Sequence, residues 1–251
     1  MSPRPGPDLR RRSGPPPRGG LLTAALATAS SWLLEPAEPS PESEPPVATR
    51  SRPVVSVFGL AARCGATTLA RGLGAELAGR SEGACAVSGS GPAGGIPLGT
   101  PAAARLARAL AELAPGRPRA SGRLCLLEAD DPLELADLAR GLAPLVLDAG
   151  RAPGGAHASV ADRVVLVAGQ SVEPSLALAV AATVSRVAPR PLVVLNRPKR
   201  SGDAADRWAD AADLVVPDSR TGAQLAMGGR EPRGAFGRGV AELADLCEAG
   251  T

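Results

Sequence analysis

The sequence has very few aromatic residues: two phenylalanines, two tryptophans and no tyrosine, together 2% of 251 residues. Apolar residues nevertheless make up 44% of the chain. A hydrophobic core must therefore be built mainly from alanine, valine and leucine, whose small side chains suit close packing of helices on a sheet. At this length the chain can hold one large α/β domain and a tail.

Cysteine and histidine are also scarce and scattered along the chain. The cysteines are Cys64, Cys85, Cys125 and Cys247. This spacing contains no CxxC pair, so it favours buried thiols in a reducing compartment over a disulfide framework or a structural zinc site. The single histidine, His157, has no histidine or cysteine near it in sequence, so metal binding and a catalytic triad are poorly supported.

The chain has neither a strong charge bias nor a long hydrophobic run. Its formal net charge is +3, and its arginines are spread out except for Arg10, Arg11 and Arg12. A nucleic-acid groove is therefore not indicated for the folded part, and we expect no specific nucleic-acid partner. No run approaches the roughly 20 apolar residues that cross a bilayer. We expect a cytoplasmic protein.

Residues 1–52 differ in composition from the rest of the chain. Proline is dense there, a basic part precedes an acidic part, and the apolar content is too low to offset the entropy of ordering. We expect a disordered tail that contains one short apolar helix over residues 21–34, which docks on a partner, on the domain or peripherally on the inner face of a membrane. A signal-peptide core is the less favoured alternative, because prolines and glycines interrupt the approach to this segment.

From residue 53 to residue 251, apolar runs alternate with helical patterns, which is typical of βαβ units. Strands are predicted at residues 54–58, 84–87, 124–127, 145–147, 164–168, 192–195 and 214–216. Helices are predicted at residues 67–79, 103–113, 133–142, 174–187 and 239–247, and around Trp208. The pattern predicts one α/β domain with a doubly wound, mainly parallel seven-stranded sheet and helices on both faces.

A strand, a glycine-bearing loop and a helix follow one another between Val54 and Leu77. Such a unit points the backbone N–H groups of a helix N-terminus at whatever lies above the loop, and the helix dipole favours an anion there. A phosphate group is therefore the expected ligand. The residues expected to bind it are Gly59, Arg63, Cys64, Gly65, Ala66, Thr67 and Thr68.

Two further residues end strands at the edge of the sheet where ligands bind in open α/β folds. Asp148 closes the fourth strand, and it is a candidate catalytic carboxylate and a candidate Mg²⁺ ligand together with Thr67. Asn196 closes the sixth strand and, with Arg197, would contact the base of a nucleotide. Each has a structural alternative: Thr67 and Asp148 could cap the segments that follow them, and Asn196 could be a turn residue before Pro198.

Taken in order, these motifs resemble the ParA/MinD family of deviant Walker A ATPases. GATTLARGLGAELAGR is similar to the family's segment that begins GKTT, LVLDAG to its Walker B or switch II strand, and LVVLNRP to its strand whose terminal asparagine contacts adenine. The resemblance covers residues 53–248. It implies a P-loop NTPase fold that binds ATP or ADP with Mg²⁺ and commonly forms nucleotide-sandwich homodimers.

The loop departs from the family pattern at its charged positions. Ala66 stands where the P-loop lysine is expected, and Ala61 stands at the position of the signature lysine. By analogy with other charge-stabilising groups in phosphoryl transfer, each loss would cost about 10³-fold in rate. Arg63 and Arg151 are the cations in the two loops that remain as substitutes.

The resemblance therefore implies a degenerate ParA/MinD-like protein that acts as a spatial positioning or assembly factor with weak or no ATP hydrolysis. Relatives of the CpaE/TadZ type and septum-site-determining proteins imply partners in a pilus, secretion or division apparatus. Alternatives are an active ATPase that uses Arg63 or a partner's residue, a partner-binding domain without a ligand, and a Rossmann-type dinucleotide enzyme. The last expects an acidic residue after the second strand, where Ser88 and Gly89 stand.

Overall fold

The computed structural model describes residues 52–89, 98–113, 117–128, 131–151, 153, 155–188, 191–196 and 206–249. The expected tail, its helix at residues 21–34, and Arg197 lie outside these ranges. Among the residues described, no helix is both long enough and apolar enough to cross a membrane.

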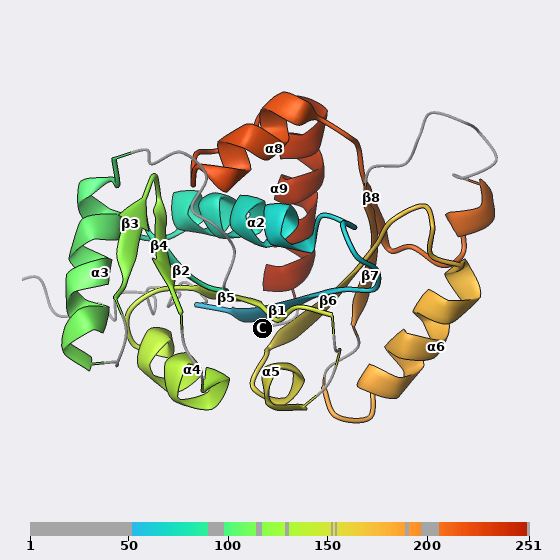
Figure 1. The fold of residues 1–251 in the computed structure, drawn as a ribbon, viewed down its shortest axis with the longest axis horizontal. Helices are drawn as coiled ribbons and strands as arrows, with labels where there is room; N and C mark the ends of the chain where they lie inside the picture. The colour runs from blue at the N-terminus through green and yellow to red at the C-terminus, as the bar shows by residue number, and fades with distance from the viewer. Residues whose placement is uncertain are drawn as a thin grey trace, which may run out of the picture. The chain divides into compact units, whose positions relative to one another are not determined.

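Eight strands form one sheet in the order β3-β4-β2-β5-β1-β6-β7-β8 (Figure 1). They are β1 (Val54–Gly59), β2 (Cys85–Ser88), β3 (Arg119–Ser121), β4 (Leu124–Leu127), β5 (Leu145–Asp148), β6 (Arg163–Ala168), β7 (Leu192–Asn196) and β8 (Leu214–Val216). All these neighbours pair in parallel except β3 with β4. The mainly parallel sheet is confirmed, although the predicted count of seven strands omitted the antiparallel edge strand β3.

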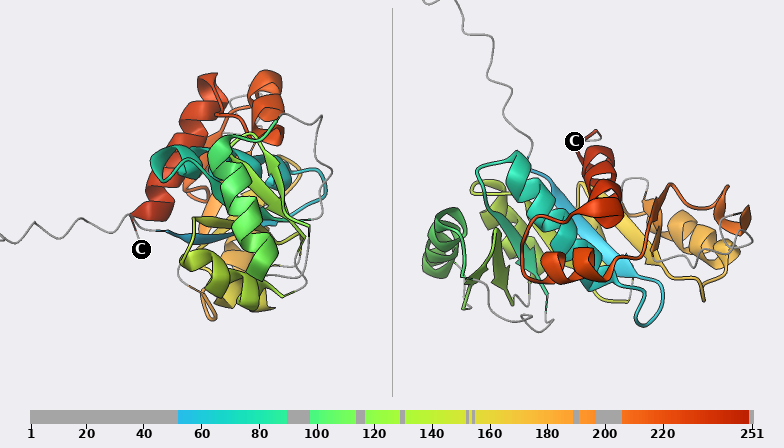
Figure 2. Two further views of the ribbon diagram at one scale, coloured as in Figure 1. Left: turned by 90° about the vertical axis from the view of Figure 1, so that its left-hand side faces the viewer. Right: turned by 90° about the horizontal axis from the view of Figure 1, so that it is seen from above.

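Helices cover both faces of the sheet, as predicted. They are α2 (Ala66–Arg80), α3 (Pro101–Leu113), α4 (Pro132–Arg140), α5 (Gly155–Ser159), α6 (Pro174–Val184), α8 (Arg220–Met227) and α9 (Gly234–Glu248). Figures 1 and 2 show α2, α8 and α9 on one face, and α4, α5 and α6 on the other. This is the doubly wound arrangement in which every central strand is buried on both sides.

The hydrophobic core fills both faces of the sheet with small apolar side chains. Along β1, Val55 and Val57 pack on the side of α2 and α9, whereas Val54 and Phe58 pack on the opposite side. Small residues permit close approach: a Cβ atom on Gly74 of α2 would lie 2.8 Å from a methyl group of Val87. All four cysteines are buried and free, as their spacing predicts.

Three helices differ from the sequence prediction, which did not include the short helix α5. The pattern did not predict α8, because its buried face is formed by the small residues Gly222 and Ala226 rather than by large apolar ones. Ser219 caps this helix by accepting a hydrogen bond from the N–H of Gly222 (3.0 Å), which is a signal that the sequence does contain. The last helix, α9, begins at Gly234 rather than at residue 239.

Candidate phosphate-binding site

The loop that follows β1, residues 60–65, is anchored by backbone hydrogen bonds to its neighbours in the sheet. The N–H of Leu60 donates to the carbonyl of Val167 in β6 (2.9 Å). The N–H of Gly59 donates to the carbonyl of Gly150, just beyond β5 (2.8 Å). The carboxyl-terminal ends of β5 and β6, the two strands beside β1, therefore fix the start of the loop.

A third anchor is Asn196, at the end of β7. Its side chain is 1% exposed, and its amide nitrogen donates to the carbonyl of Cys64 (2.8 Å). The amide oxygen of Asn196 has no hydrogen-bond partner among the residues the structure describes. Asn196 therefore ties the loop to the end of β7 through the carbonyl of Cys64.

Cys64 contributes to the loop through its backbone rather than its thiol. The residue is 7% exposed, and its sulfur would lie 2.8 Å from a Cβ atom built on Gly59. Because Gly59 has no side chain, the thiol of Cys64 can pack against its backbone. Any ligand contact from Cys64 has to come from its main chain.

The backbone of the loop turns sharply before α2. Arg63 has φ 59° and Gly65 has φ 87°, both in the left-handed region; for a residue with a side chain, such as Arg63, this conformation is uncommon. No side chain caps the start of α2 at Gly65. The first N–H groups of the helix therefore lack a side-chain partner, and their positive dipole end suits an anion.

A cavity of about 580 Å³ opens above the loop, a volume typical of small-molecule sites. Its lining includes the predicted residues Gly59, Arg63, Cys64, Gly65, Ala66, Thr67, Thr68 and Asp148. The parallel register explains this convergence, since the carboxyl ends of β1 and β5 lie side by side. Asn196 lies outside the lining, and Arg197 lies outside the described residues.

Asp148 is half-buried at the end of β5 and rests on Gly89. A Cβ atom on Gly89, whose φ is 155°, would lie 2.8 Å from the Cβ of Asp148 and 3.3 Å from one carboxylate oxygen. Gly89 therefore leaves the room that the aspartate side chain occupies. Thr67 and Asp148 line the same cavity and are the residues that would hold Mg²⁺, completed by ligand and water oxygens.

No lysine reaches this cavity from the described part of the chain. The sequence contains a single lysine, Lys199, and it lies outside the described ranges. Ala61 and Ala66 place methyl groups in the lining where a P-loop of the resembled family carries lysines. The charged residues of the lining are Arg63 and Arg151, which are exposed, and Asp148.

A buried cation that the sequence analysis missed lies inside α2, one turn beyond Thr67. Arg71 is 3% exposed, and its guanidinium donates to the carbonyl of Met227 at the end of α8 (3.2 Å). Burial lowers the pKa of Arg71, and attraction to Asp148 opposes that lowering. The sequence does contain a signal for the burial of Arg71, because its neighbours along α2 are small or apolar.

Groups of three or more histidine, cysteine, aspartate or glutamate side chains that could hold a metal are absent from the described ranges. A metal at the loop would therefore depend on few protein ligands. This suits Mg²⁺, which retains several water molecules and is usually bound together with substrate phosphates.

No protein-family model and no curated protein matches the sequence. Solved structures do match the fold. A ParA family ATPase from Chlorobium tepidum has a TM-score of 0.55 at 15% identity, covering 77% of this chain and 98% of that one. The McdA–ATP complex of Cyanothece has a TM-score of 0.53 at 13% identity, covering 80% and 98%. The MinC:MinD cell division protein complex of Aquifex aeolicus has a TM-score of 0.51 at 16% identity, covering 79% and 96%.

Proposed function

We propose that this chain, which has the P-loop fold of the ParA/MinD ATPases, is a degenerate protein of that type that acts as a spatial positioning or assembly factor. The observation that carries the proposal is the contrast within one loop. Its backbone keeps an anion-binding form, with left-handed turns at Arg63 and Gly65 and an uncapped helix behind them. Its two lysine positions are Ala61 and Ala66.

Nucleotide binding by this site is weak and depends on the backbone. The N–H groups at the start of α2 would hold a phosphate of ATP or ADP, and Thr67 with Asp148 would hold Mg²⁺. A contact between Asn196 and the base of a nucleotide would require the loop to open, because Asn196 is buried and its amide nitrogen bonds the carbonyl of Cys64. Without the two lysines, the transition state of phosphoryl transfer lacks its main charge stabilisation, so hydrolysis is slow or absent.

Proteins rather than a metabolite are the proposed partners. The MinC:MinD cell division protein complex contains a chain with this fold, and the CpaE/TadZ-like and septum-site proteins that the sequence resembles imply a pilus, secretion or division apparatus. A homodimer of this chain would have to form without a signature lysine, because Ala61 stands there. The apolar segment 21–34 is the proposed contact with a membrane surface.

A calorimetric titration with ADP and Mg²⁺, combined with an assay of phosphate release from Mg·ATP, tests the proposal. We expect weak, saturable ADP binding and no phosphate release above the blank. Turnover at rates normal for ParA/MinD ATPases would refute the proposal, and loss of that turnover in R63A would identify an active ATPase that uses Arg63. Complete absence of ADP binding would leave a partner-binding domain without a ligand.

A Rossmann-type dinucleotide enzyme is tested separately. Neither NAD nor NADP is expected to raise the melting temperature, because Ser88 ends β2 and Gly89 follows it, where a ribose-binding acid is required. A clear stabilisation by either dinucleotide would favour this alternative.

A further inference from the structure

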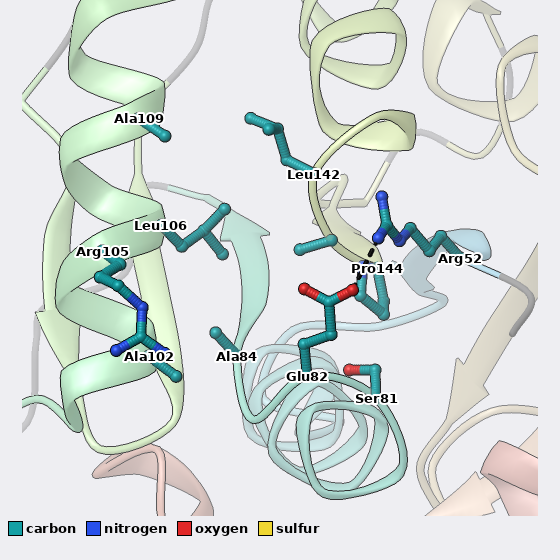
Figure 3. A pocket seen from close by; sticks show the side chains of 11 residues that line it. Arg52, Ser81, Glu82, Ala84, Ala102, Arg105, Leu106, Ala109, Leu142 and Pro144 are labelled. Carbon is teal, nitrogen blue, oxygen red and sulfur yellow. Dashed lines mark hydrogen bonds and ion pairs between the residues drawn. The ribbon is translucent and has the colours of Figure 1, made fainter. Parts of the chain in front are cut away.

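A second cavity, of about 190 Å³, lies at the other edge of the sheet (Figure 3). It is bounded by α3, by the turn that follows α2, and by the residues that precede β2 and β5. Its walls are formed mainly by the apolar side chains of Ala84, Ala102, Leu106, Leu142 and Pro144. In Figure 3, Leu106 of α3 and Leu142 face one another across the space.

This cavity is separate from the phosphate-binding site. The loop lies at the N-terminus of α2, whereas Ser81 and Glu82 of the cavity follow its C-terminus. A helix of 15 residues spans about 22 Å at about 1.5 Å per residue. Since the strands are parallel, the cavity also lies at their amino ends, away from the edge that carries Asp148.

The charged residues at the margin of the cavity are two arginines and one glutamate. Arg52 and Glu82 form an ion pair (2.8 Å), so their charges offset one another. Arg105 projects from α3 on the other side, and within the described ranges no carboxylate forms an ion pair with it. The margin therefore carries an excess positive charge beside an apolar interior.

Ser81 lines the cavity but does not offer its hydroxyl to it. The hydroxyl oxygen is buried and finds no partner in the part of the chain that the structure describes. Because that oxygen is buried, a molecule in the cavity does not reach it in this conformation. The cavity thus offers a cation and apolar walls to one ligand.

We propose that this cavity binds a small monocarboxylate with an apolar body. The carboxylate pairs with the guanidinium of Arg105, and the body packs between Leu106 and Leu142. The cavity, at about 190 Å³, is smaller than the roughly 300–1,000 Å³ of sites for drug-sized ligands. The body is therefore limited to the size of one aromatic ring or a short alkyl chain.

The test uses 4-hydroxybenzoate as the probe and ligand-detected NMR titrations of the full-length protein. We expect saturable binding at millimolar concentration, and at least tenfold weaker binding to R105Q, because a charge-assisted hydrogen bond is lost. R108Q is the matched control, since Arg108 is an exposed arginine on the same helix that does not line the cavity. A109L, which places a larger side chain in the lining, should abolish binding.

Probe chemistry separates this site from adsorption to the surface. 4-Hydroxybenzyl alcohol has the same ring without the carboxylate, so it should bind at least tenfold more weakly than 4-hydroxybenzoate. Failure of the wild-type protein to saturate, equal affinities of R105Q and wild type, or equal losses in R105Q and R108Q would each overturn the proposal. Arg105 is exposed, so R105Q is expected to fold, and its melting temperature verifies this. ADP binding to R105Q should remain that of wild type.

Discussion

Introducing one lysine into the loop is the most direct test of whether a missing cation limits nucleotide binding at this site. Ala66 is the first residue of α2, is half-buried, and lines the cavity of about 580 Å³ above the loop. A lysine there would extend its ammonium group into that space. The A66K substitution should therefore bring a positive charge to the position where the loop would hold the nucleotide's phosphates.

The expected gain follows from the strength of a charge-assisted hydrogen bond. Such a bond contributes about 1.5–3 kcal/mol, and about 1.4 kcal/mol corresponds to a tenfold change in affinity. A66K should therefore bind ADP about 10- to 100-fold more tightly than wild type. The direct attraction between two charges 4 Å apart is about 4 kcal/mol at an effective dielectric constant of about 20, and desolvation of the lysine reduces it to this range.

The measurement is calorimetric titration of ADP with Mg²⁺ at two salt concentrations, with A62K as the control. Ala62 lies in the same loop but is exposed, so a lysine there adds the same charge without a fixed geometry and should change affinity only slightly. Equal gains in A66K and A62K would refute the reasoning, because the effect would then be general attraction. We expect hydrolysis to remain slow in A66K, since Ala61 still occupies the signature position.

Three further predictions concern the frame of the site and the buried thiols. N196L removes the hydrogen bond to Cys64 and leaves a buried carbonyl unpaired, so urea denaturation should show a loss of about 1–3 kcal/mol in unfolding free energy; unchanged stability would contradict the tether. G89A places a Cβ atom 2.8 Å from that of Asp148 at a φ of 155°. The melting temperature of this variant should fall, and Mg²⁺ should enhance its ADP binding less than that of wild type. An unchanged melting temperature and an unchanged effect of Mg²⁺ would show that Gly89 does not confine Asp148. Burial raises the pKa of Cys125 and of Cys247 to about 12 and also raises that of Cys85. The unfolded thiols ionise near pH 8.5. The free energy of unfolding that these raised pKa values contribute is therefore fully present below that pH and is lost as pH rises toward 12. A thiol reagent at pH 8 should label these three cysteines only after unfolding.

The sequence predicts the central strands well because their composition leaves few alternatives. Runs such as that of β6 (Arg163–Ala168) are almost wholly apolar, which is typical of strands buried on both faces. The edge strand β3 escapes prediction because Arg119 is polar and exposed and the strand is held only by β4. Its hairpin turn contains Gly122, whose φ of 55° is a turn signal that is weak without knowledge of the partner strand.

The candidate site is predictable where it depends on topology and less so where it depends on side-chain direction. Asp148 and the loop converge because parallel strands end at one edge of the sheet. The sequence does not reveal that the amide of Asn196 bonds the carbonyl of Cys64, since this requires the rotamer and the path of the loop. Arg71 was missed for a related reason: an arginine in a helix is usually exposed, and here packing of α8 on α2 encloses it.

The conformation of the loop is fixed by three hydrogen bonds to residues at the ends of neighbouring strands. The bonds from Gly59 to Gly150, from Leu60 to Val167 and from Asn196 to Cys64 are all made within the protein. Folding stability and ligand affinity are thus separate traits at this position, and a substitution can abolish one while sparing the other. Alanine at position 66 leaves these anchors intact, so the residue at this position can change the affinity for an anion without changing the frame of the loop.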